Sequence, residues 1–190
     1  MTSKSAAKGA LRCWLGAAAL AFILAATSGC GFHPIYASAP NTTAVTGQMA
    51  QVKVDPIDYS IGQQSDLFRL GQQLHNELLA RINPDGTPAK PIYAVRVHLS
   101  EAESDIAVDP SGLSQRSSIL ETATFKLVSL ADGKAVMEGT SVGINSFGNV
   151  TNAFATVEGR NDARVRAISF IADDITTRIA LYFRREPEAK

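Results

Sequence analysis

The sequence predicts a two-layer α+β domain in which two helices pack on one face of a four-stranded mixed sheet. Two apolar stripes have helical spacing, and the segments between them alternate apolar and polar side chains in the manner of strands. The dipeptide Asp132-Gly133 stands between two such segments and is typical of a tight hairpin. With 190 residues, of which 45% are hydrophobic, the chain can build one domain with a core.

The first half of the domain is expected to contain a strand, a helix and a second strand. Residues 51–55 alternate and predict a short strand, and Ser65 can cap a helix that begins at Asp66. The sequence Asn83-Pro84-Asp85-Gly86 ends this helix, and residues 93–100 alternate again. The apolar stripe of the helix consists of Leu67, Leu70, Leu74, Leu78 and Ile82. We expect the acidic residues 101–109 to form a solvated loop.

The second half predicts a hairpin and a long helix. Strands are expected at 117–130 and 135–145, joined by the turn at 131–134, and the final helix at 163–183. The inward face of the strand at 117–130 should carry Ile119, Ala123, Phe125 and Leu127. The apolar stripe of the final helix consists of Ile168, Ile171, Ala172, Ile175, Ile179 and Tyr182. The sheet face without helices is predicted to be polar, with Arg96, His98, Thr122, Thr124 and Lys126.

The N-terminal residues have the pattern of an export signal. Residues 1–29 contain three basic and no acidic side chains, followed by an apolar run at 14–26 that is short for a membrane span. Thr27-Ser28-Gly29-Cys30 resembles a bacterial lipobox, and Cys30 is the only cysteine after the predicted cleavage site. We therefore expect residues 1–29 to be removed and Cys30 to carry acyl chains. Residues 30–49 are interpreted as a lipidated N-terminus and tether, 50–185 as the domain, and 186–190 as a disordered tail.

Composition and motifs argue against several functions. The whole chain has 18 basic and 18 acidic residues, which disfavours a nucleic-acid binder, and residues 30–190 carry a net charge of −3. None of the three histidines has a second ligand at metal spacing, and neither a Gly-x-Ser-x-Gly nor a Ser-x-x-Lys motif occurs. The sequence thus predicts no catalytic residue, no metal and no cofactor.

One uncharged stretch stands out in this chain. Residues 139–157 contain no Asp, Glu, Lys or Arg and are rich in Gly, Ser, Thr and Asn. They are either a surface that lies against a partner, where an unpaired charge would be costly, or simply a strand followed by a polar loop. Composition does not separate these two interpretations.

Residues 30–36 have the sequence Cys-Gly-Phe-His-Pro-Ile-Tyr, which resembles the start of the mature LPS-assembly lipoproteins of the LptE (RlpB) family. Phe154-Ala155 and residues 162–167, leading to Ile175 and Arg178, resemble the final helix of the alphaproteobacterial type. The resemblance implies a non-enzymatic lipoprotein of the cell outer membrane. It would plug the β-barrel of the LPS-assembly protein LptD, help that barrel assemble and assist lipopolysaccharide transport to the outer leaflet.

The resemblance also implies contacts between lipopolysaccharide and basic residues on loops. Arg116 and Arg160 are the basic residues nearest the corresponding loops, although each is equally consistent with a solvated surface charge. An alternative function is that of an accessory, substrate-binding lipoprotein of an envelope lipid ABC transport system. The partner distinguishes the two, because the first needs a β-barrel and the second an inner-membrane ATPase complex.

Overall fold

The computed structural model describes residues 42–59, 66–108, 110 and 114–185. Contacts divide the chain into Met1–Ala37 and Ser38–Lys190, and every described residue belongs to the second unit. The predictions for the signal peptide, Cys30, the Ser65 cap and the tail at 186–190 lie outside the described residues.

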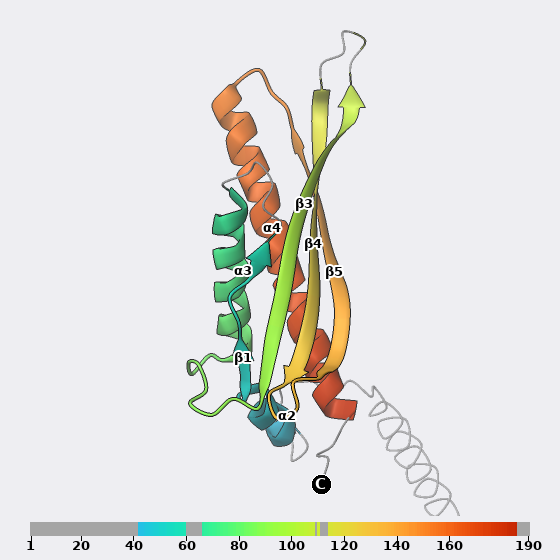
Figure 1. The fold of residues 1–190 in the computed structure, drawn as a ribbon. Helices are drawn as coiled ribbons and strands as arrows, with labels where there is room; N and C mark the ends of the chain where they lie inside the picture. The colour runs from blue at the N-terminus through green and yellow to red at the C-terminus, as the bar shows by residue number, and fades with distance from the viewer. Residues whose placement is uncertain (1–41, 60–65, 109, 111–113, 186–190) are drawn as a thin grey trace, which may run out of the picture. The chain divides into compact units, whose positions relative to one another are not determined.

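The described part is the mixed α+β fold that the sequence predicts. Its order is α2 (Thr42–Met49), β1 (Val52–Val54), β2 (Asp58–Tyr59), α3 (Asp66–Ile82), β3 (Tyr93–Val108), β4 (Ser114–Ser129), β5 (Ala135–Gly148) and α4 (Ala153–Arg185). The sheet has the order β1-β3-β4-β5, and the additional two-residue strand β2 pairs with β3 beyond β1. Figure 1 shows these elements along the chain.

The sheet combines parallel and antiparallel pairs. β1 and β2 both run parallel to β3, with Val52 opposite Tyr93 and Asp58 opposite His98. β3, β4 and β5 form an antiparallel meander. Asp132-Gly133 makes the predicted turn between β4 and β5, where Gly133 has a φ of 71°, a value that glycine adopts without steric cost.

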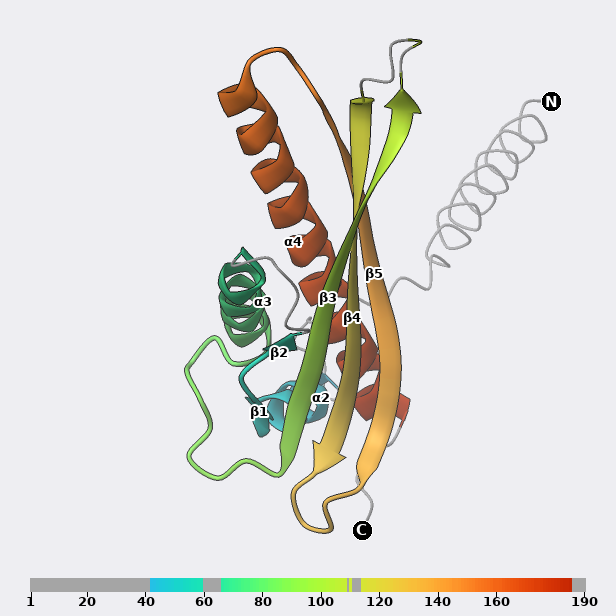
Figure 2. The ribbon, with the colours of Figure 1, turned by 45° about the horizontal axis from the view of Figure 1, so that its top comes forward.

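The two long helices cover one face of this sheet (Figure 2). α3 contacts β1, β2 and β3, α4 contacts β4 and β5, and the two helices contact each other. The predicted stripes are buried at Leu70, Leu74, Leu78 and Ile82 of α3 and at Ile168, Ile171, Ala172, Ile175 and Ile179 of α4. At the end of α4 the buried aromatic ring is Phe183 rather than Tyr182, and it packs against Tyr93 with ring centroids 5.2 Å apart.

The prediction of an acidic loop at 101–109 is wrong, because β3 continues to Val108 and pairs with β4 from Ser114 onward. The inward carboxylates of this extension have basic partners: Glu101 pairs with Arg164 and Glu103 with Arg160. Those partners come from a helix some sixty residues later, so the local sequence shows only a run of acidic side chains.

Other element boundaries also differ from the prediction. The last eight residues of the expected tether form α2 instead, and its Val45 and Met49 are buried. α4 begins ten residues before the predicted start, capped by Asn152, whose Oδ1 accepts hydrogen bonds from the main-chain N–H groups of Phe154 (3.0 Å) and Ala155 (3.4 Å). β4 starts at Ser114, and β5 continues to Gly148, three residues beyond each expected limit.

Candidate functional site

The face of the sheet opposite the helices is polar along the first half of β3 and the last part of β4, as predicted. Between the register shifts near the strand ends, even-numbered residues of β3, β4 and β5 point to this outer face, and Arg96, His98, Thr124 and Lys126 are exposed there. One end of the face is charged, and Lys126 pairs with Glu138 at 3.0 Å. Between this pair and Arg116, which also faces outward near the other end of β4, eight outward-facing residues of β4 and β5 carry no formal charge: Ser118, Leu120, Thr122, Thr124, Thr140, Val142, Ile144 and Ser146.

An apolar patch lies within this uncharged region. We call Leu120, Val142 and Ile144 the outer patch; they are 37%, 40% and 66% exposed. The strand register makes them neighbours, because Leu120 lies opposite Ile144 and Thr122 lies opposite Val142. Large apolar side chains on a sheet face that lacks a covering layer are suited to contact with another molecule.

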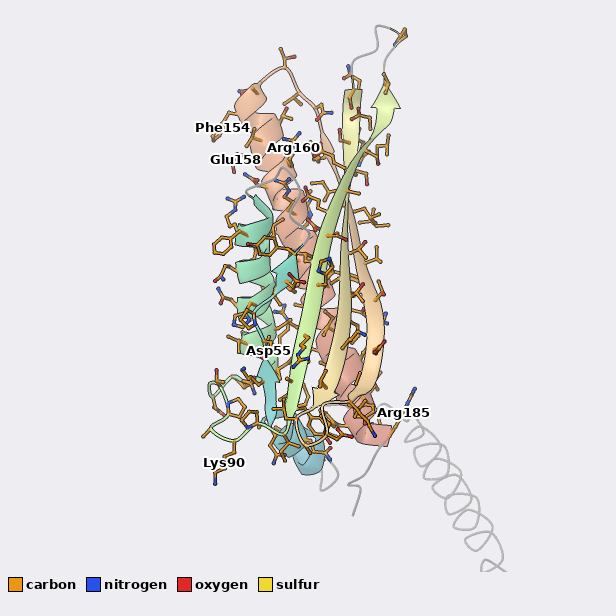
Figure 3. The ribbon with its side chains drawn as sticks, viewed as in Figure 1. Asp55, Lys90, Phe154, Glu158, Arg160 and Arg185 are labelled. Carbon is orange, nitrogen blue, oxygen red and sulfur yellow. The ribbon has the colours of Figure 1, made fainter. Side chains whose placement is uncertain are left out.

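The uncharged stretch at 139–157 has three structural parts. It comprises most of β5, the connection at 149–152 and the first turns of α4, so it is more than the strand and loop of the simpler interpretation. The connection and the start of α4 expose Val150, Phe154 and Val157. Phe154 is 73% exposed and projects from the N-terminal end of α4 (Figure 3).

The structure does not bring Arg116 and Arg160 together. Arg116 is on the outer face of β4, where its guanidinium donates to Ser146 Oγ at 2.9 and 3.2 Å. Arg160 lies between α4 and the strands (Figure 3), pairs with Glu103 at 3.1 Å and stands 5.2 Å from the centre of the Phe147 ring. Glu103 and Phe147 point to the helix face, so the two arginines lie on opposite sides of the sheet.

The sequence analysis missed a buried charged cluster under α4. Glu101 and Glu121 lie directly opposite each other on β3 and β4, both on the helix face. Arg164 of α4 reaches Glu101 with two hydrogen bonds, of 2.7 Å from Nε and 2.6 Å from Nη2. The Arg164 and Glu101 side chains are only 4% and 1% exposed, and Glu121 is fully buried. The signal was present in the strand pattern, because Glu121 falls between the inward residues Ile119 and Ala123.

The two carboxyl groups of this cluster differ in protonation state. Burial, together with the neighbouring Glu101 carboxyl, raises the pKa of Glu121 to about 9, although the charge of Arg164 acts in the opposite direction. Glu121 is therefore protonated at neutral pH, and Arg164 with Glu101 forms a neutral pair. Within the described residues, neither carboxyl oxygen of Glu121 makes a well-formed hydrogen bond. The cluster forms a structural contact between the sheet and α4, because Arg164 of the helix is hydrogen-bonded to Glu101 of the strand.

A second group of charges lines a hollow on the outer face, near β1 and β2. Asp55 pairs with Lys53 at 2.9 Å and with Arg96 at 3.3 Å, and Asp58 Oδ2 lies 3.1 Å from His98 Nδ1. Burial acts to raise the pKa of Asp55, but the hydrogen bonds and charges of Lys53 and Arg96 outweigh it and lower the pKa. Acidic and basic side chains neutralise each other here, which gives the hollow no strong preference for either charge.

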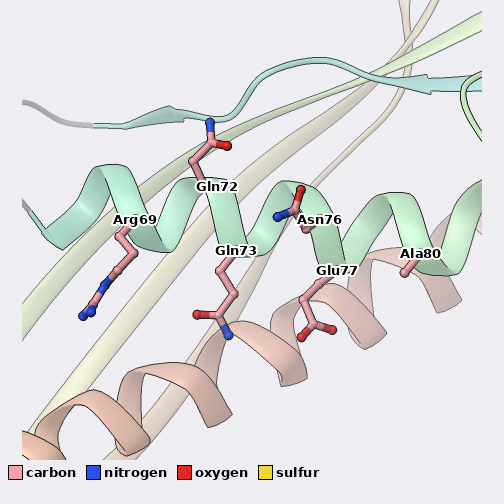
Figure 4. Close-up of a pocket in the computed structure, with 6 residues that line it drawn as sticks. All are labelled: Arg69, Gln72, Gln73, Asn76, Glu77 and Ala80. Carbon is pink, nitrogen blue, oxygen red and sulfur yellow. The ribbon is translucent and has the colours of Figure 1, made fainter.

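A second depression lies on α3 and is lined by Arg69, Gln72, Gln73, Asn76, Glu77 and Ala80 (Figure 4). Amide side chains dominate its wall, and Glu77 is paired with Arg81. Within the described residues, no three His, Cys, Asp or Glu side chains are placed to hold a metal ion. In that same part of the chain, every helix is too short or too polar to span a bilayer.

The fold is shared with solved lipoproteins. A protein of Caulobacter crescentus assigned as a lipoprotein superposes with a TM-score of 0.56 and 15% identity, over 76% of this chain and 98% of its own. A minor lipoprotein of Acinetobacter baumannii has a TM-score of 0.50 and 14% identity, over 70% of this chain and 94% of its own. Their likeness to this chain is one of fold. The rare lipoprotein B of Shewanella oneidensis superposes with a TM-score of 0.49 and 13% identity, over 68% of this chain and 93% of its own. No protein-family model matches the sequence, and no curated protein matches it either.

Proposed function

We propose that this chain is an outer-membrane lipoprotein of the LptE type, anchored through acyl chains on Cys30. In this proposal the domain occupies the lumen of an LptD-type β-barrel, helps that barrel assemble and assists lipopolysaccharide delivery to the outer leaflet. It acts by occupying its partner and catalyses no reaction.

The outer face of β4 and β5 carries no formal charge between Arg116 and the Lys126–Glu138 pair, and this observation carries the proposal. The lumen of a membrane β-barrel is lined by polar side chains, and a domain inside it must form hydrogen bonds without burying unpaired charges. Hydroxyl groups at Ser118, Thr122, Thr140 and Ser146 can donate and accept hydrogen bonds, while the outer patch supplies apolar contact area.

Two further observations support the proposal. Residues 30–36 and 162–167 resemble the LptE family at positions distant in the sequence. The fold of the described residues is that of two proteins that are themselves named as lipoproteins. Arg116 and Arg160 remain the proposed lipopolysaccharide contacts, and of the two only Arg116 belongs to the outer face.

Leu120→Asp tests this proposal at the centre of the outer patch. Leu120 faces outward from β4 and has the uncharged residues Ala102 and Ile144 directly opposite it, so Leu120→Asp introduces a carboxylate at a position without a directly opposed basic residue. Burying it against a barrel wall costs free energy, and we expect at least a tenfold loss of the barrel protein that co-purifies with the affinity-tagged, detergent-extracted lipoprotein.

Two control variants separate loss of binding from loss of folding. Leu120→Thr keeps the position neutral and should retain the barrel, whereas Phe170→Asp places the same charge at an exposed apolar position of α4. Both should co-purify with the barrel as the unmodified chain does. Undiminished barrel recovery with Leu120→Asp would contradict the proposal, as would recovery of an inner-membrane ATPase complex in place of a barrel.

A further inference from the structure

The two edges of the sheet are protected to very different degrees. The β3 edge is covered by β1 and β2 as far as Leu99, and beyond that point β3 carries Glu101, Glu103 and Asp105. Short covering strands and charged side chains are the usual devices that prevent an edge from pairing with another chain. β5 forms the other edge, and no described strand lies beside it (Figures 1 and 2).

β5 has few of these protective features. Its 14 residues include no proline and no lysine, and its one charged residue is Glu138, close to its start. From Gly139 to Gly148 the strand is uncharged, and within it Thr140, Val142 and Ile144 are β-branched residues that favour strand pairing. Continuous pairing with β4 from Met137 to Gly148 holds this segment in a regular extended conformation.

The direction of the β5 main-chain groups follows from one hydrogen bond. The Asn149 N–H donates to the Gln115 carbonyl oxygen at 3.0 Å, so odd-numbered residues of β5 exchange hydrogen bonds with β4. In an antiparallel pair the alternate residues point their N–H and C=O groups the other way. The N–H and C=O groups of Thr140, Val142, Ile144 and Ser146 therefore face the open edge, and within the described residues none of them has a hydrogen-bond partner.

The outward-facing residues of β5 are complementary to the same residues in a second copy of the strand. If a second β5 lies antiparallel with its centre opposite Gly143, Val142 faces Ile144 of the other copy and Thr140 faces Ser146. Apolar β-branched residues then meet at the centre and hydroxyl groups meet on either side, both of which are favourable cross-strand pairs. Glu138 falls opposite Gly148 of the other copy, so no like charges are opposed.

We propose that two copies of this chain associate through antiparallel pairing of their β5 edges, centred on Gly143. Every residue that points its main-chain groups outward would meet one that does the same, which allows a complete ladder of hydrogen bonds. The two outer patches would become adjacent on one continuous sheet face. This dimer is a property of the protein without its barrel, so it can be tested separately from the function proposed above.

Val142→Pro tests the edge directly. Proline removes an N–H that faces the open edge, while the hydrogen bonds to β4 come from the odd-numbered residues and remain. We expect the full-length protein in detergent to sediment as a dimer, and Val142→Pro to sediment as a monomer over at least a tenfold range of concentration. Val142→Thr keeps both the N–H and the β-branched shape, and should remain dimeric.

A disulfide test fixes the register and does not depend on the proline variant folding. Val142→Cys and Ile144→Cys chains are prepared separately and oxidised either alone or after mixing, and the cross-linked peptides are identified by mass spectrometry. Directly opposed residues in a hydrogen-bonded antiparallel pair lie about 5.5 Å apart between Cα atoms, within the range that a disulfide spans. We expect the 142–144 cross-link of the mixture to exceed either symmetric cross-link several-fold.

Three results would overturn the inference. They are a monomeric unmodified chain at all concentrations, a dimer that Val142→Pro leaves intact, and equal yields of the mixed and symmetric cross-links. None of these bears on co-purification with a barrel, which Leu120→Asp tests at a position on β4 away from the edge.

Discussion

At the scale of single residues, a buried ion pair between Arg164 and Glu101, with Glu121 beside it, joins α4 to the sheet. Arg164 satisfies one carboxylate with two hydrogen bonds, and the second carboxyl group is held in its neutral form. Removing the arginine alone would leave a buried, unpaired Glu101, which is costly in a site of this burial.

The raised pKa of Glu121 makes stability depend on pH. Between about pH 4.5 and 9, folded Glu121 keeps its proton while the unfolded chain releases it, so the free energy of unfolding falls as pH rises through this window. Glu121→Gln removes the titrating group at nearly constant shape. We expect its melting temperature to exceed that of the unmodified chain at pH 8 and to approach it at pH 5.

The control for this prediction is Glu138→Gln, on the exposed outer face. It should leave the difference in melting temperature between pH 5 and pH 8 unchanged. Equal pH dependence of the unmodified chain and Glu121→Gln would show that Glu121 is not the group responsible.

The sequence correctly predicted which face of the sheet a side chain points to where the alternation of apolar and polar residues is regular. Alternation correctly placed Arg96, His98, Thr124 and Lys126 on the outer face. Alternation also places Glu121 inward, between Ile119 and Ala123, but it does not show what allows that burial: Arg164, from a separate element, neutralises the neighbouring Glu101. Nothing near Glu121 in the sequence indicates that pairing.

At the scale of elements, close packing of β5 against α4 depends on glycine. A Cβ at Gly143 would lie 2.8 Å from the Ala167 carbonyl oxygen and 2.9 Å from the Ala167 Cβ. These atoms belong to the helix backbone and its first side-chain carbon, so they cannot move aside as a long side chain would. The separation of strand and helix is thus set by the absence of a side chain at this position.

Gly143→Ala should therefore be destabilising even though alanine usually improves a strand. We expect a loss of about 1–3 kcal/mol in the free energy of unfolding, the usual cost of inserting a methyl group into a close-packed contact. Chemical denaturation measures it. Gly148→Ala, at the end of the same strand, meets no atom within 4 Å and should be neutral or slightly stabilising; a similar loss in both variants would exclude the packing explanation.

Among the elements, sequence patterns predicted the regular centres and missed the extensions. α3 and the β4–β5 hairpin come from a clear stripe, a clear alternation and an Asp-Gly turn, so their prediction was confirmed. Two extensions were missed because they lack an apolar face of their own. They are the outer half of β3 and the first ten residues of α4, which are stabilised by ion pairs and by a helix cap. α2 buries Val45 and Met49 in a segment that is otherwise rich in small residues, and this pattern is too weak to distinguish from a tether.

At the scale of the whole molecule, the described helices α3 and α4 cover one face of the sheet, and no described helix covers the centre of the other face. Residues 1–41, which include the predicted anchor, lie outside the described residues. The proposed function connects the anchor with the outer face of the sheet, since acyl chains on Cys30 would keep that face near the membrane and its barrel.

Cys30→Ser tests the anchor. Each buried CH₂ of an acyl chain contributes about 0.8 kcal/mol to membrane binding, and serine cannot form the thioether that attaches the lipid. We expect this variant to take up no radiolabelled palmitate and to leave the membrane fraction. Cys13→Ser changes the other cysteine, within the predicted leader, and should label normally; palmitate retained by Cys30→Ser would place the lipid elsewhere.

The parallel pairing of β1 and β2 with β3 has a consequence for how the chain matures. The residues that pair in these parallel ladders are far apart in the sequence: Val52 pairs with Tyr93, and Asp58 pairs with His98. In contrast, β3, β4, β5 and α4 follow one another directly along the chain. Because contacts close in sequence form fastest, the meander and final helix can assemble first. β1 and β2, which precede all the other strands in the chain, would then be the last strands to join the sheet.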